Sequence, residues 1–497
     1  MFVKRNEMDR PSNYTLEFVQ RVKPHHIKRD PWLVDPYVKE SLEELIGRST
    51  VEEFGSYTRS FYTLEGHYSN LWKYDRPITP PINDPIFDLA VQKARESLRL
   101  PVPVSTYNWE RLKDVPYISS SSAGWGYIGK KGAPGNQTRA IERANAYLRW
   151  WLDMRYGKAR YNYLYHPDLA WTRTQISEID APKIRHVWGK SFENIILEGI
   201  SAAPLVQAYR DFQSPIVIGQ SMYKRLPLII SQVLHNSDDE YRPNFGIGID
   251  FKSFDTSPQE WLIDIAFDIL EDNLIFSGYY EYESFNYSKY YFTHTPVVMP
   301  DGRLWRKHLG IPSGSYFTQL IGSTINLILM YYIQLKLYNK TFMTYVLGDD
   351  SLFGIPAEYG YPDLNQMAAI VSPLGFTIHP HKCVVANRPQ ELHFLGHYAR
   401  HTRVDRDEAE LMRMVLYPEY PVDGPTMSMS RVLGMMIDSA LNSWAAVHLY
   451  KYMKAKYRNL IPDTITFTTD MKDWLVAVVG TAPEQHLLTE FDIFNIT

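Results

Sequence analysis

Two adjacent carboxylates, Asp349 and Asp350, are the residues of this sequence with the clearest potential for chemistry. They follow Gly348 and stand between apolar residues in the segment 345–355. Apolar runs on both sides of such a centre predict two short strands joined by a tight turn. Because two negative charges at one turn repel each other, a divalent cation with oxygen ligands, such as Mg²⁺, would stabilise the pair. A solvated hairpin turn, in which aspartate only favours the turn conformation, is the alternative.

A third carboxylate, Asp250, follows a second predicted strand. Alternating isoleucines in the segment 245–249 predict a buried strand that ends at Asp250, and Asp255 follows shortly after. The sequence Ser-Pro-Gln-Glu at 257–260 has the pattern of a helix capping box, so we expect a helix to begin directly after Asp255. Strand, carboxylate, turn, second carboxylate and helix would make a compact platform for a ligand.

A long apolar segment after residue 317 has one polar side. In this segment Thr318, Gly322 and Asn326 recur at every fourth residue, which places them on one side of a predicted helix that extends to about residue 337. Asparagine and glycine are poor helix formers in a helix interior. The polar seam therefore indicates a ligand surface rather than packing.

Basic residues gather in one part of a chain whose net charge is −4. Residues 111–190 contain 14 Lys and Arg against 6 Asp and Glu, a net charge of +8, so the rest of the chain carries −12. A basic module beside an acidic one is what a phosphate channel next to a metal site requires. Lys183 and Arg185 would face the same side of an extended segment, where they could hold a polyphosphate. A solvated charged surface is the alternative.

Two further lysine-containing segments are candidates for phosphate contacts. The small-residue loop at 116–132 ends in Lys130 and Lys131. Its serines and glycines allow backbone N–H groups to approach a phosphate, although the spacing of a P-loop is absent and a plain flexible loop fits equally well. Lys382, which lies after the Asp349–Asp350 segment, is a cation that could approach a leaving pyrophosphate.

The composition of the whole chain is that of a globular protein. At 497 residues the chain exceeds one typical core, so we expect two or three subdomains. Its single cysteine, Cys383, excludes an intramolecular disulfide and indicates a reducing compartment. The longest apolar runs, 226–234 and 325–335, are too short or too interrupted to span a bilayer, so no membrane is expected. Apolar residues at helical spacing predict a helical tail over 427–457.

In their order along the chain, these residues resemble the motifs of viral RNA-dependent RNA polymerases. Asp250 with Asp255 resembles motif A, and the Gly348-Asp349-Asp350 sequence resembles motif C. The other matches are Lys183 and Arg185 with motif F, Ser313, Gly314, Thr318 and Asn326 with motif B, Lys382 with motif D, Phe394-Leu395-Gly396 with motif E, and Ser122-Ala123-Gly124-Trp125 with motif G. The resemblance covers residues 117–397 and is strongest to polymerases of partitiviruses, with those of picobirnaviruses next.

The resemblance implies an α+β, right-hand polymerase fold of fingers, palm and thumb, in which an antiparallel palm sheet packs on helices. It implies that residues 1–204 form an N-terminal extension and the fingers, 205–268 the first part of the palm, 269–305 a fingers insertion, 306–398 the second part of the palm, and 399–497 a mainly helical thumb. Residues 1–100 and 400–497 match no motif, so their assignment rests on analogy alone.

The resemblance also implies template-directed RNA synthesis from NTPs, in the replication and transcription of a double-stranded RNA virus genome. Two Mg²⁺ ions, replaceable by Mn²⁺, would be held by Asp250 and Asp349 with Asp350 in support. The substrate contacts implied are Lys183 and Arg185 on the triphosphate, Asp255 and Asn326 on the ribose 2′-hydroxyl, and Ser313, Gly314 and Thr318 nearby. Lys382 would be the general acid. Ser122, Ala123, Gly124, Lys130 and Lys131 would line the template entrance.

The partners implied are template RNA, product RNA, NTPs and the viral capsid protein, inside a virus particle within the host cytoplasm. Two alternatives remain. A reverse transcriptase shares paired catalytic aspartates, but it places a bulky steric gate near motif A, whereas Asp255 and Asn326 here favour a ribose contact. A non-catalytic RNA-binding virion protein explains the basic region, but it gives no reason for three carboxylates beside a polar helix seam.

Overall fold

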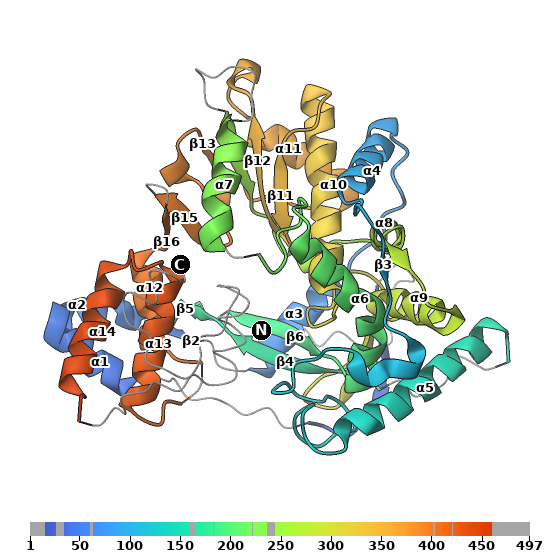
Figure 1. Cartoon of the computed structure of the whole chain (residues 1–497), viewed down its shortest axis with the longest axis horizontal. Coiled ribbons are helices and arrows are strands. Elements are labelled where there is room, and N and C mark those ends of the chain that lie inside the picture. Colours follow the sequence, from blue (N-terminus) through green and yellow to red (C-terminus); the bar gives the residue numbers. More distant parts are fainter. Residues whose placement is uncertain are drawn as a thin grey trace.

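The computed structural model describes residues 15–25, 34–59, 63–158, 166–181, 183–220, 222–235, 244–400, 403–419 and 421–459. Three bodies lie around the centre of the molecule in Figure 1. A sheet with its helices is at the top, a larger body is at the right, and a helical body at the left contains both blue and red segments. The body at the left therefore joins helices from early and late parts of the chain.

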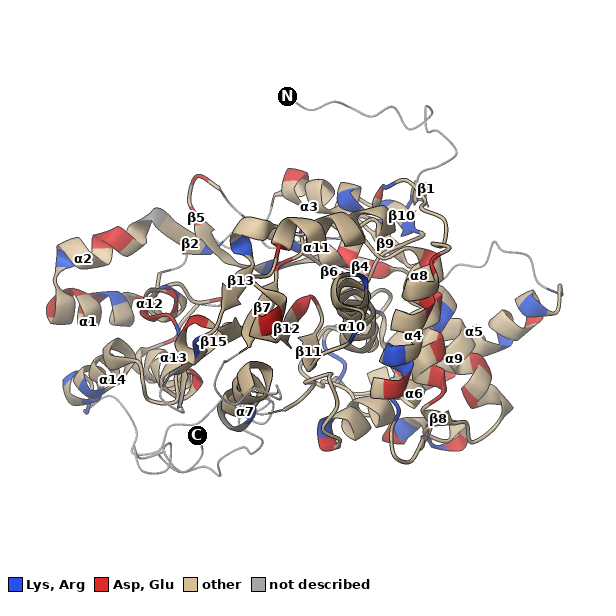
Figure 2. Ribbon diagram, turned by 90° about the horizontal axis from the view of Figure 1, so that it is seen from above, with Lys and Arg blue, Asp and Glu red and all other residues tan. Residues whose placement is uncertain are grey.

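A four-stranded antiparallel sheet carries the predicted carboxylates. Its strand order is β11 (Thr344–Leu347), β12 (Asp350–Ile355), β7 (Phe245–Ile249) and β13 (Val384–Ala386). Ser351 pairs with Ile249, so Asp250 lies beside the turn between β11 and β12. Figure 2 shows acidic segments close together at β7 and β12. The hairpin and the strand predicted from the sequence are confirmed.

Helices cover both faces of this sheet. The helices that share a hydrophobic core with one face are α4 (Pro85–Ser97), α8 (Glu260–Glu271), α10 (Thr318–Tyr338) and α11 (Leu364–Val371), while α7 (Met222–His235) packs on the other face. Successive strand residues alternate between these cores, since Val346 and Phe353 belong to the first and Tyr345 and Leu352 to the second.

The central helix of the core is α10. Every residue from 320 to 335 is buried. Among the described residues α10 is the one helix long and apolar enough to cross a membrane, with a mean hydropathy of 1.3, but 89% of that window is buried inside the protein. Its apolar composition therefore reflects its position in the core. The helix ends at Tyr338, close to the predicted end, because Asn339 adopts a positive φ of 53°.

The capping box predicted at 257–260 is wrong. Helix α8 begins at Glu260 with Gln259 at its N-cap, after a 3₁₀ turn over Phe254–Thr256. The Ser257 hydroxyl accepts instead from the Arg76 guanidinium at 2.7 Å. This contact comes from a part of the chain remote in sequence, which the local pattern could not show.

The body at the right of Figure 1 combines helices with a five-stranded sheet. The strand order is β1 (Leu16–Arg21), β10 (Arg303–Lys307), β9 (Pro296–Val298), β4 (Asp168–Thr174) and β6 (Ile184–Gly189), and the helices are α5 (Asn136–Arg155), α6 (Phe192–Asp211) and α9 (Tyr279–Thr293). All pairs in this sheet are antiparallel except β4 with β9. Segments from three distant parts of the sequence therefore build one body.

Helices from early and late parts of the chain form the helical body at the left of Figure 1. Its helices, which share one hydrophobic core, are α1 (Pro36–Ile46), α2 (Arg48–Glu53), α12 (Glu408–Leu416), α13 (Pro425–Asp438) and α14 (Trp444–Lys456). Asp35, at the N-cap of α1, accepts from Arg431 at 2.6 Å and from Ser428 at 2.9 Å. Residues 35–53, which fall in the range 1–204 predicted to form an N-terminal extension and the fingers, pack on helices of the range 399–497 predicted to form the thumb.

A two-stranded pair links this body to the body at the right. β2 (Tyr57–Arg59) pairs with β5 (Ile176–Glu178), and Arg59 donates to the Tyr417 carbonyl at 2.6 Å. The remaining elements are α3 (Leu64–Leu71), β3 (Val104–Ser105) paired in parallel with β8 (Leu274–Ile275), short 3₁₀ turns, and a sheet of β14 (His393–Phe394), β15 (His397–Arg400) and β16 (Arg403–Asp405). The assigned parts of the fingers and thumb that cover 1–14 and 460–497 lie outside the described residues.

Candidate active site

Residues of α10 hold the turn that carries Asp349 and Asp350. Gly348 has a positive φ of 60°, and its N–H donates to the Ser323 hydroxyl at 2.8 Å. The side-chain amide of Asn326 donates to the carbonyl oxygens of Gly348 at 3.0 Å and Asp350 at 3.2 Å. The polar side predicted for this helix therefore supports the carboxylate turn.

Asp250 lies next to this turn, at the end of β7. Its N–H donates to the Cys383 sulfur at 3.3 Å, and its carbonyl accepts from the His379 N–H at 2.9 Å. Burial and the negative charges of Asp349 and Asp250 raise the pKa of Asp350 to about 7. The three carboxylates therefore form one electrostatic site.

The donor set of this site fits a divalent cation. Mg²⁺ prefers oxygen ligands, and a cation would relieve the repulsion that helps to raise the pKa of Asp350. In the part of the chain that the structure describes, no three His, Cys, Asp or Glu side chains are already grouped closely enough to hold an ion. Mg²⁺ sites commonly use one or two carboxylates and leave the other positions to water and substrate phosphates. The carboxylates present therefore fit an ion that binds together with a phosphate substrate.

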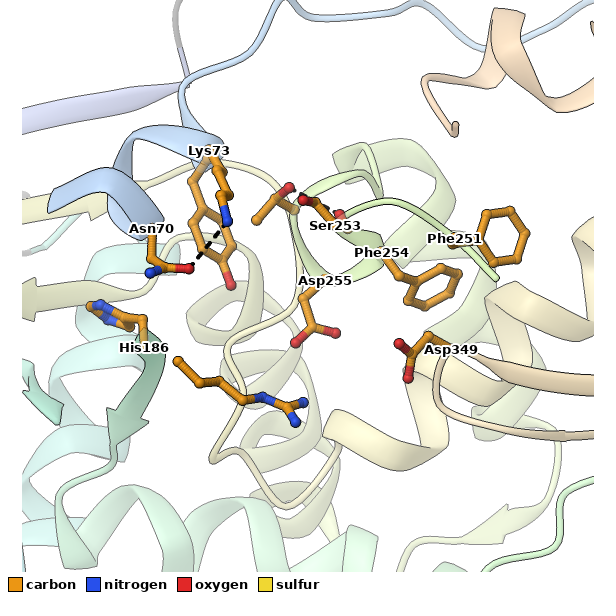
Figure 3. A pocket seen from close by; sticks show the side chains of 11 residues that line it. Asn70, Lys73, His186, Phe251, Ser253, Phe254, Asp255 and Asp349 are labelled. Atoms are coloured by element: carbon orange, nitrogen blue, oxygen red, sulfur yellow. Dashed lines mark hydrogen bonds between the residues drawn. The ribbon is translucent and has the colours of Figure 1, made fainter. Parts of the chain in front are cut away.

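A pocket of about 170 Å³ opens beside Asp349. Six of the residues that line it are Arg185, Asp255, Asp349, Asn70, Lys73 and Tyr74. Figure 3 shows the Asp255 side chain between the hydrogen-bonded Asn70 and Lys73 on one side and Asp349 on the other. Three of the predicted site residues, Arg185, Asp255 and Asp349, therefore meet in one space although they come from different elements.

Asn70, Lys73 and Tyr74 are pocket residues that the sequence did not reveal. They lie in α3 and the 3₁₀ turn after it, within the first hundred residues. Lys73 donates to Asn70 Oδ1 at 3.3 Å, and the Tyr74 hydroxyl donates to the Ile311 carbonyl at 2.9 Å. These residues belong to no recognisable motif, so only the tertiary structure places them at the site.

Ser313 fixes the Asp255 carboxylate, with its hydroxyl donating to Asp255 Oδ2 at 2.5 Å. Burial raises the pKa of Asp255, the hydrogen bond from Ser313 opposes this shift, and the Asp349 charge adds to it. The loop that presents Ser313 is joined to β6, because the Trp188 N–H donates to the Ser313 carbonyl at 2.9 Å. A Cβ atom on Gly314 would lie 2.1 Å from the Trp188 carbonyl oxygen, so this close approach requires glycine.

Thr318 and Asn326, which were also predicted to bind substrate, do not line this pocket. The Thr318 hydroxyl donates to the Pro312 carbonyl at 2.9 Å and so closes the loop before α10. Asn326 is fully buried and is not among the pocket-lining residues. Its buried Oδ1 has no hydrogen-bond partner among the described residues. The observed contacts of both residues brace the site.

The model of the viral RNA-dependent RNA polymerase family matches residues 35–456. The chain belongs to this polymerase family. The RNA-directed RNA polymerase of Cryptosporidium parvum virus 1 (strain KSU-1) is 40% identical over 106 residues, which are 21% of this chain and 20% of the relative. That of White clover cryptic virus 1 (isolate Boccardo/2004) is 24% identical over 212 residues, 40% of this chain and 34% of the relative. The chain thus spans about a third or less of the lengths of these two curated relatives.

Solved structures of viral polymerases share the fold. The crystal structure of the RNA-dependent RNA polymerase of a human picobirnavirus has a TM-score of 0.64 at 14% identity, over 86% of this chain and 84% of that chain. The insertion-loop deletion mutant of that polymerase has a TM-score of 0.63 at 15% identity, over 87% of both chains. The predicted α+β, right-hand fold with an antiparallel palm sheet packed on helices is confirmed. Dependence on divalent metal ions is general in this family.

The three basic residues predicted to contact the nucleotide lie in different places. Arg185, on β6, lines the pocket. Lys183 lies just before β6, is exposed, and is not among the pocket-lining residues. Lys382 is exposed at the end of a 3₁₀ turn, next to the Cys383 thiol that accepts from the Asp250 N–H. The structure therefore places Arg185 in the pocket and Lys382 next to the cysteine that contacts the Asp250 backbone.

The predicted template-entrance loop of the polymerase packs on the chain just after β6. The Phe192 N–H donates to the Ala123 carbonyl at 3.0 Å. Gly124 has a positive φ of 85°, and a Cβ atom there would lie 2.7 Å from Ser191 Cα. Ala123 and Gly124 therefore anchor the loop to the start of α6, and both are buried.

The two lysines predicted at this entrance have different environments. Lys130 and Ser122 are exposed. Lys131 is only 8% exposed, and its ammonium donates to the Ser121 hydroxyl at 2.7 Å and to the Ser122 carbonyl at 2.8 Å. Burial lowers the pKa of Lys131 to about 8. Lys131 therefore holds the loop together, and Lys130 is the lysine that faces solvent. The RNA contact of both lysines stays a prediction.

Proposed function

We propose that the chain catalyses template-directed RNA synthesis from NTPs and so replicates and transcribes a double-stranded RNA virus genome. The observation that carries this proposal is the Asp255 carboxylate, which Ser313 holds in the same pocket as Asp349 and Arg185. A fixed hydrogen-bonding group beside paired carboxylates suits recognition of the ribose 2′-hydroxyl, which distinguishes RNA precursors from DNA precursors. The family membership of the chain supports the same activity.

The carboxylate site is proposed to hold the metal ions of this reaction. Asp250 and Asp349, with Asp350 in support, would bind two Mg²⁺ ions, or Mn²⁺ in their place. When bound, the ions would activate the primer 3′-hydroxyl and stabilise the leaving pyrophosphate. The hairpin delivers Asp349 at a turn that α10 holds by hydrogen bonds, so the backbone of the site is fixed before substrate arrives.

The basic residues around the pocket are proposed to orient the nucleotide. Arg185 can hold the triphosphate with two parallel hydrogen bonds, and Lys183 adds positive charge next to β6. Lys73 would bind the same group, because it lines the same pocket. Lys382 is the candidate general acid for the departing pyrophosphate, because it lies next to the residue that contacts Asp250.

The proposed partners are template RNA, product RNA and NTPs, with the viral capsid protein as a further partner. The exposed Lys130 and Ser122 are the groups at the template entrance that can meet a phosphate backbone. We place the polymerase inside a virus particle within the host cytoplasm, in line with the viruses of the relatives.

The activity can be tested by incubating the purified chain with an RNA template, Mg²⁺ and either labelled NTPs or labelled dNTPs. We expect template-dependent incorporation of NTPs with strong preference over dNTPs. Preferential incorporation of dNTPs would identify a reverse transcriptase. RNA binding without any incorporation would identify a non-catalytic RNA-binding protein.

Replacing Lys73 by alanine is expected to raise KM for NTPs by about fivefold, or about 1 kcal/mol, with kcat nearly unchanged. An ammonium at the pocket wall attracts the triphosphate equally before and during reaction, so its loss weakens binding rather than chemistry. Steady-state kinetics measure the effect. Lys93→Ala is the matched control, because Lys93 is a surface lysine paired with Glu96 at 2.8 Å. Equal KM values in the two variants would remove Lys73 from the nucleotide site.

A further inference from the structure

A buried carboxylate outside the pocket holds the loop that carries Ser313. Glu198 lies on α6 and is 1% exposed. Its Oε2 accepts from the Ser315 hydroxyl at 2.9 Å and from the Tyr316 N–H at 2.8 Å. The Ser315 hydroxyl also accepts from the Phe317 N–H at 3.1 Å. The Glu198 carboxylate is therefore the acceptor that organises this loop, up to Phe317 before α10.

The other oxygen of this carboxylate faces a buried lysine. Lys190 Nζ lies 3.2 Å from Glu198 Oε1 and 3.5 Å from Asp168 Oδ2, and the Lys190 side chain is 1% exposed. These groups interact through charge without hydrogen-bond geometry. Lys190 directly follows β6, the strand that bears Arg185. Glu198 therefore ties the strand of Arg185 to the loop of Ser313.

Buried charges are an inefficient way to stabilise a fold. Desolvation of each ion opposes folding, and well-packed apolar residues of similar volume often give equal or greater stability. A buried ionic group can instead serve to select one arrangement among several. Glu198 has the geometry for this role, because it accepts two hydrogen bonds from fixed directions in one short loop.

We propose that Glu198 is a positioning residue for sugar selection, which sets the loop at 313–316 so that Ser313 orients the Asp255 carboxylate toward the ribose 2′-hydroxyl. The inference rests on the proposed function for its chemistry. Glu198 itself does not line the pocket. Its replacement should therefore change the discrimination between NTP and dNTP without removing a direct substrate contact.

The same helix supplies a matched control, Glu193. This residue is fully buried, and its carboxylate accepts from the Tyr127 hydroxyl at 2.6 Å and lies 2.5 Å from His166 Nδ1. Neither partner belongs to the loop at 313–316. Glu193→Gln therefore removes a buried negative charge from α6 and leaves the contacts of that loop in place.

The selectivity test compares kcat/KM for NTP with kcat/KM for dNTP. Glu198→Gln is expected to lower this ratio about tenfold. Lys190 then faces a neutral amide in place of a carboxylate, and this amide no longer fixes the loop at 313–316. Ser315→Ala should lower the ratio in the same direction, and the double variant should add little, since both changes act on one contact. Glu193→Gln should keep the ratio within about twofold of wild type. An unchanged ratio in Glu198→Gln and Ser315→Ala, or an equal loss in Glu193→Gln, would overturn the proposal.

A second measurement needs no enzymatic activity. Hydrogen–deuterium exchange of a peptide spanning 312–317 should become faster in Glu198→Gln, because the Tyr316 amide loses its charged acceptor, and it should stay at the wild-type rate in Glu193→Gln. Unchanged exchange in Glu198→Gln would overturn the positioning role while leaving the proposed polymerase function intact. Faster exchange in a protein that incorporates no nucleotide would instead overturn the polymerase function, and with it the sugar selection.

Discussion

Replacing Asp349 by asparagine is expected to slow nucleotide incorporation by about 10³-fold or more while the chain stays folded. Asparagine keeps the size of the side chain but lacks the charge that a divalent cation requires, a loss of roughly 4 kcal/mol in the transition state. The turn does not depend on this side chain, because Ser323 and Asn326 hold its backbone. Single-turnover incorporation at saturating NTP and Mg²⁺ measures the rate, and thermal melting checks the fold.

Asp211→Asn is the matched control for this experiment. Asp211 is an exposed aspartate at the end of α6, and its carboxylate accepts from Gln207 at 2.8 Å. This variant should react at the wild-type rate. If Asp349→Asn retained incorporation within about tenfold of wild type, Asp349 would not be a metal ligand of the reaction.

Truncating Asn326 to alanine is expected to slow the incorporation of NTPs and dNTPs alike, by about 10- to 100-fold. The change removes the amide that donates to the carbonyls of Gly348 and Asp350, so the carboxylate turn loses its brace. A displacement of about 1 Å at a reacting centre can cost about 10²-fold in rate. Single-turnover rates with both classes of nucleotide measure the effect.

Gln334 provides the comparison for Asn326 on the same helix. It is fully buried, donates to the Thr344 hydroxyl at 2.9 Å and accepts from the Phe342 N–H at 2.8 Å, at the end of the hairpin away from the turn. Alanine at either position should lower stability by about 1–3 kcal/mol, but only Asn326→Ala should slow the reaction. A lower NTP-over-dNTP ratio with an unchanged dNTP rate would instead give Asn326 the ribose contact predicted from the sequence.

The parts of the site that follow local patterns could be predicted from the sequence. The strand before Asp250 and the hairpin around Asp349 bury apolar residues at a strand period, so both carboxylates could be placed at strand ends. The helix from 318 to 338 was predictable for the same reason. The meeting of Asp255 with Arg185 could be expected only through the resemblance, because no spacing joins residues so far apart.

The parts that could not be predicted depend on partners remote in sequence. Lys130 and Lys131 are adjacent and chemically identical, yet only Lys131 is buried by the fold of its own loop. No sequence pattern marks Lys73 as a pocket residue, because tertiary packing alone brings it to the pocket. The helical tail predicted over 427–457 is two helices, since Ala440 and Leu441 adopt positive φ values of 49° and 65°.

The ion pair between Asp35 and Arg431 joins residues 396 positions apart in the sequence. At synthesis rates of about 5–20 residues per second, roughly 20–80 s pass on the ribosome between the two partners. During that interval Val38 and Leu42, which are buried in the finished protein, lack helices α13 and α14 to pack against. The helical body therefore closes only after Arg431 has been synthesised, and until then the apolar surface of α1 is open to aggregation.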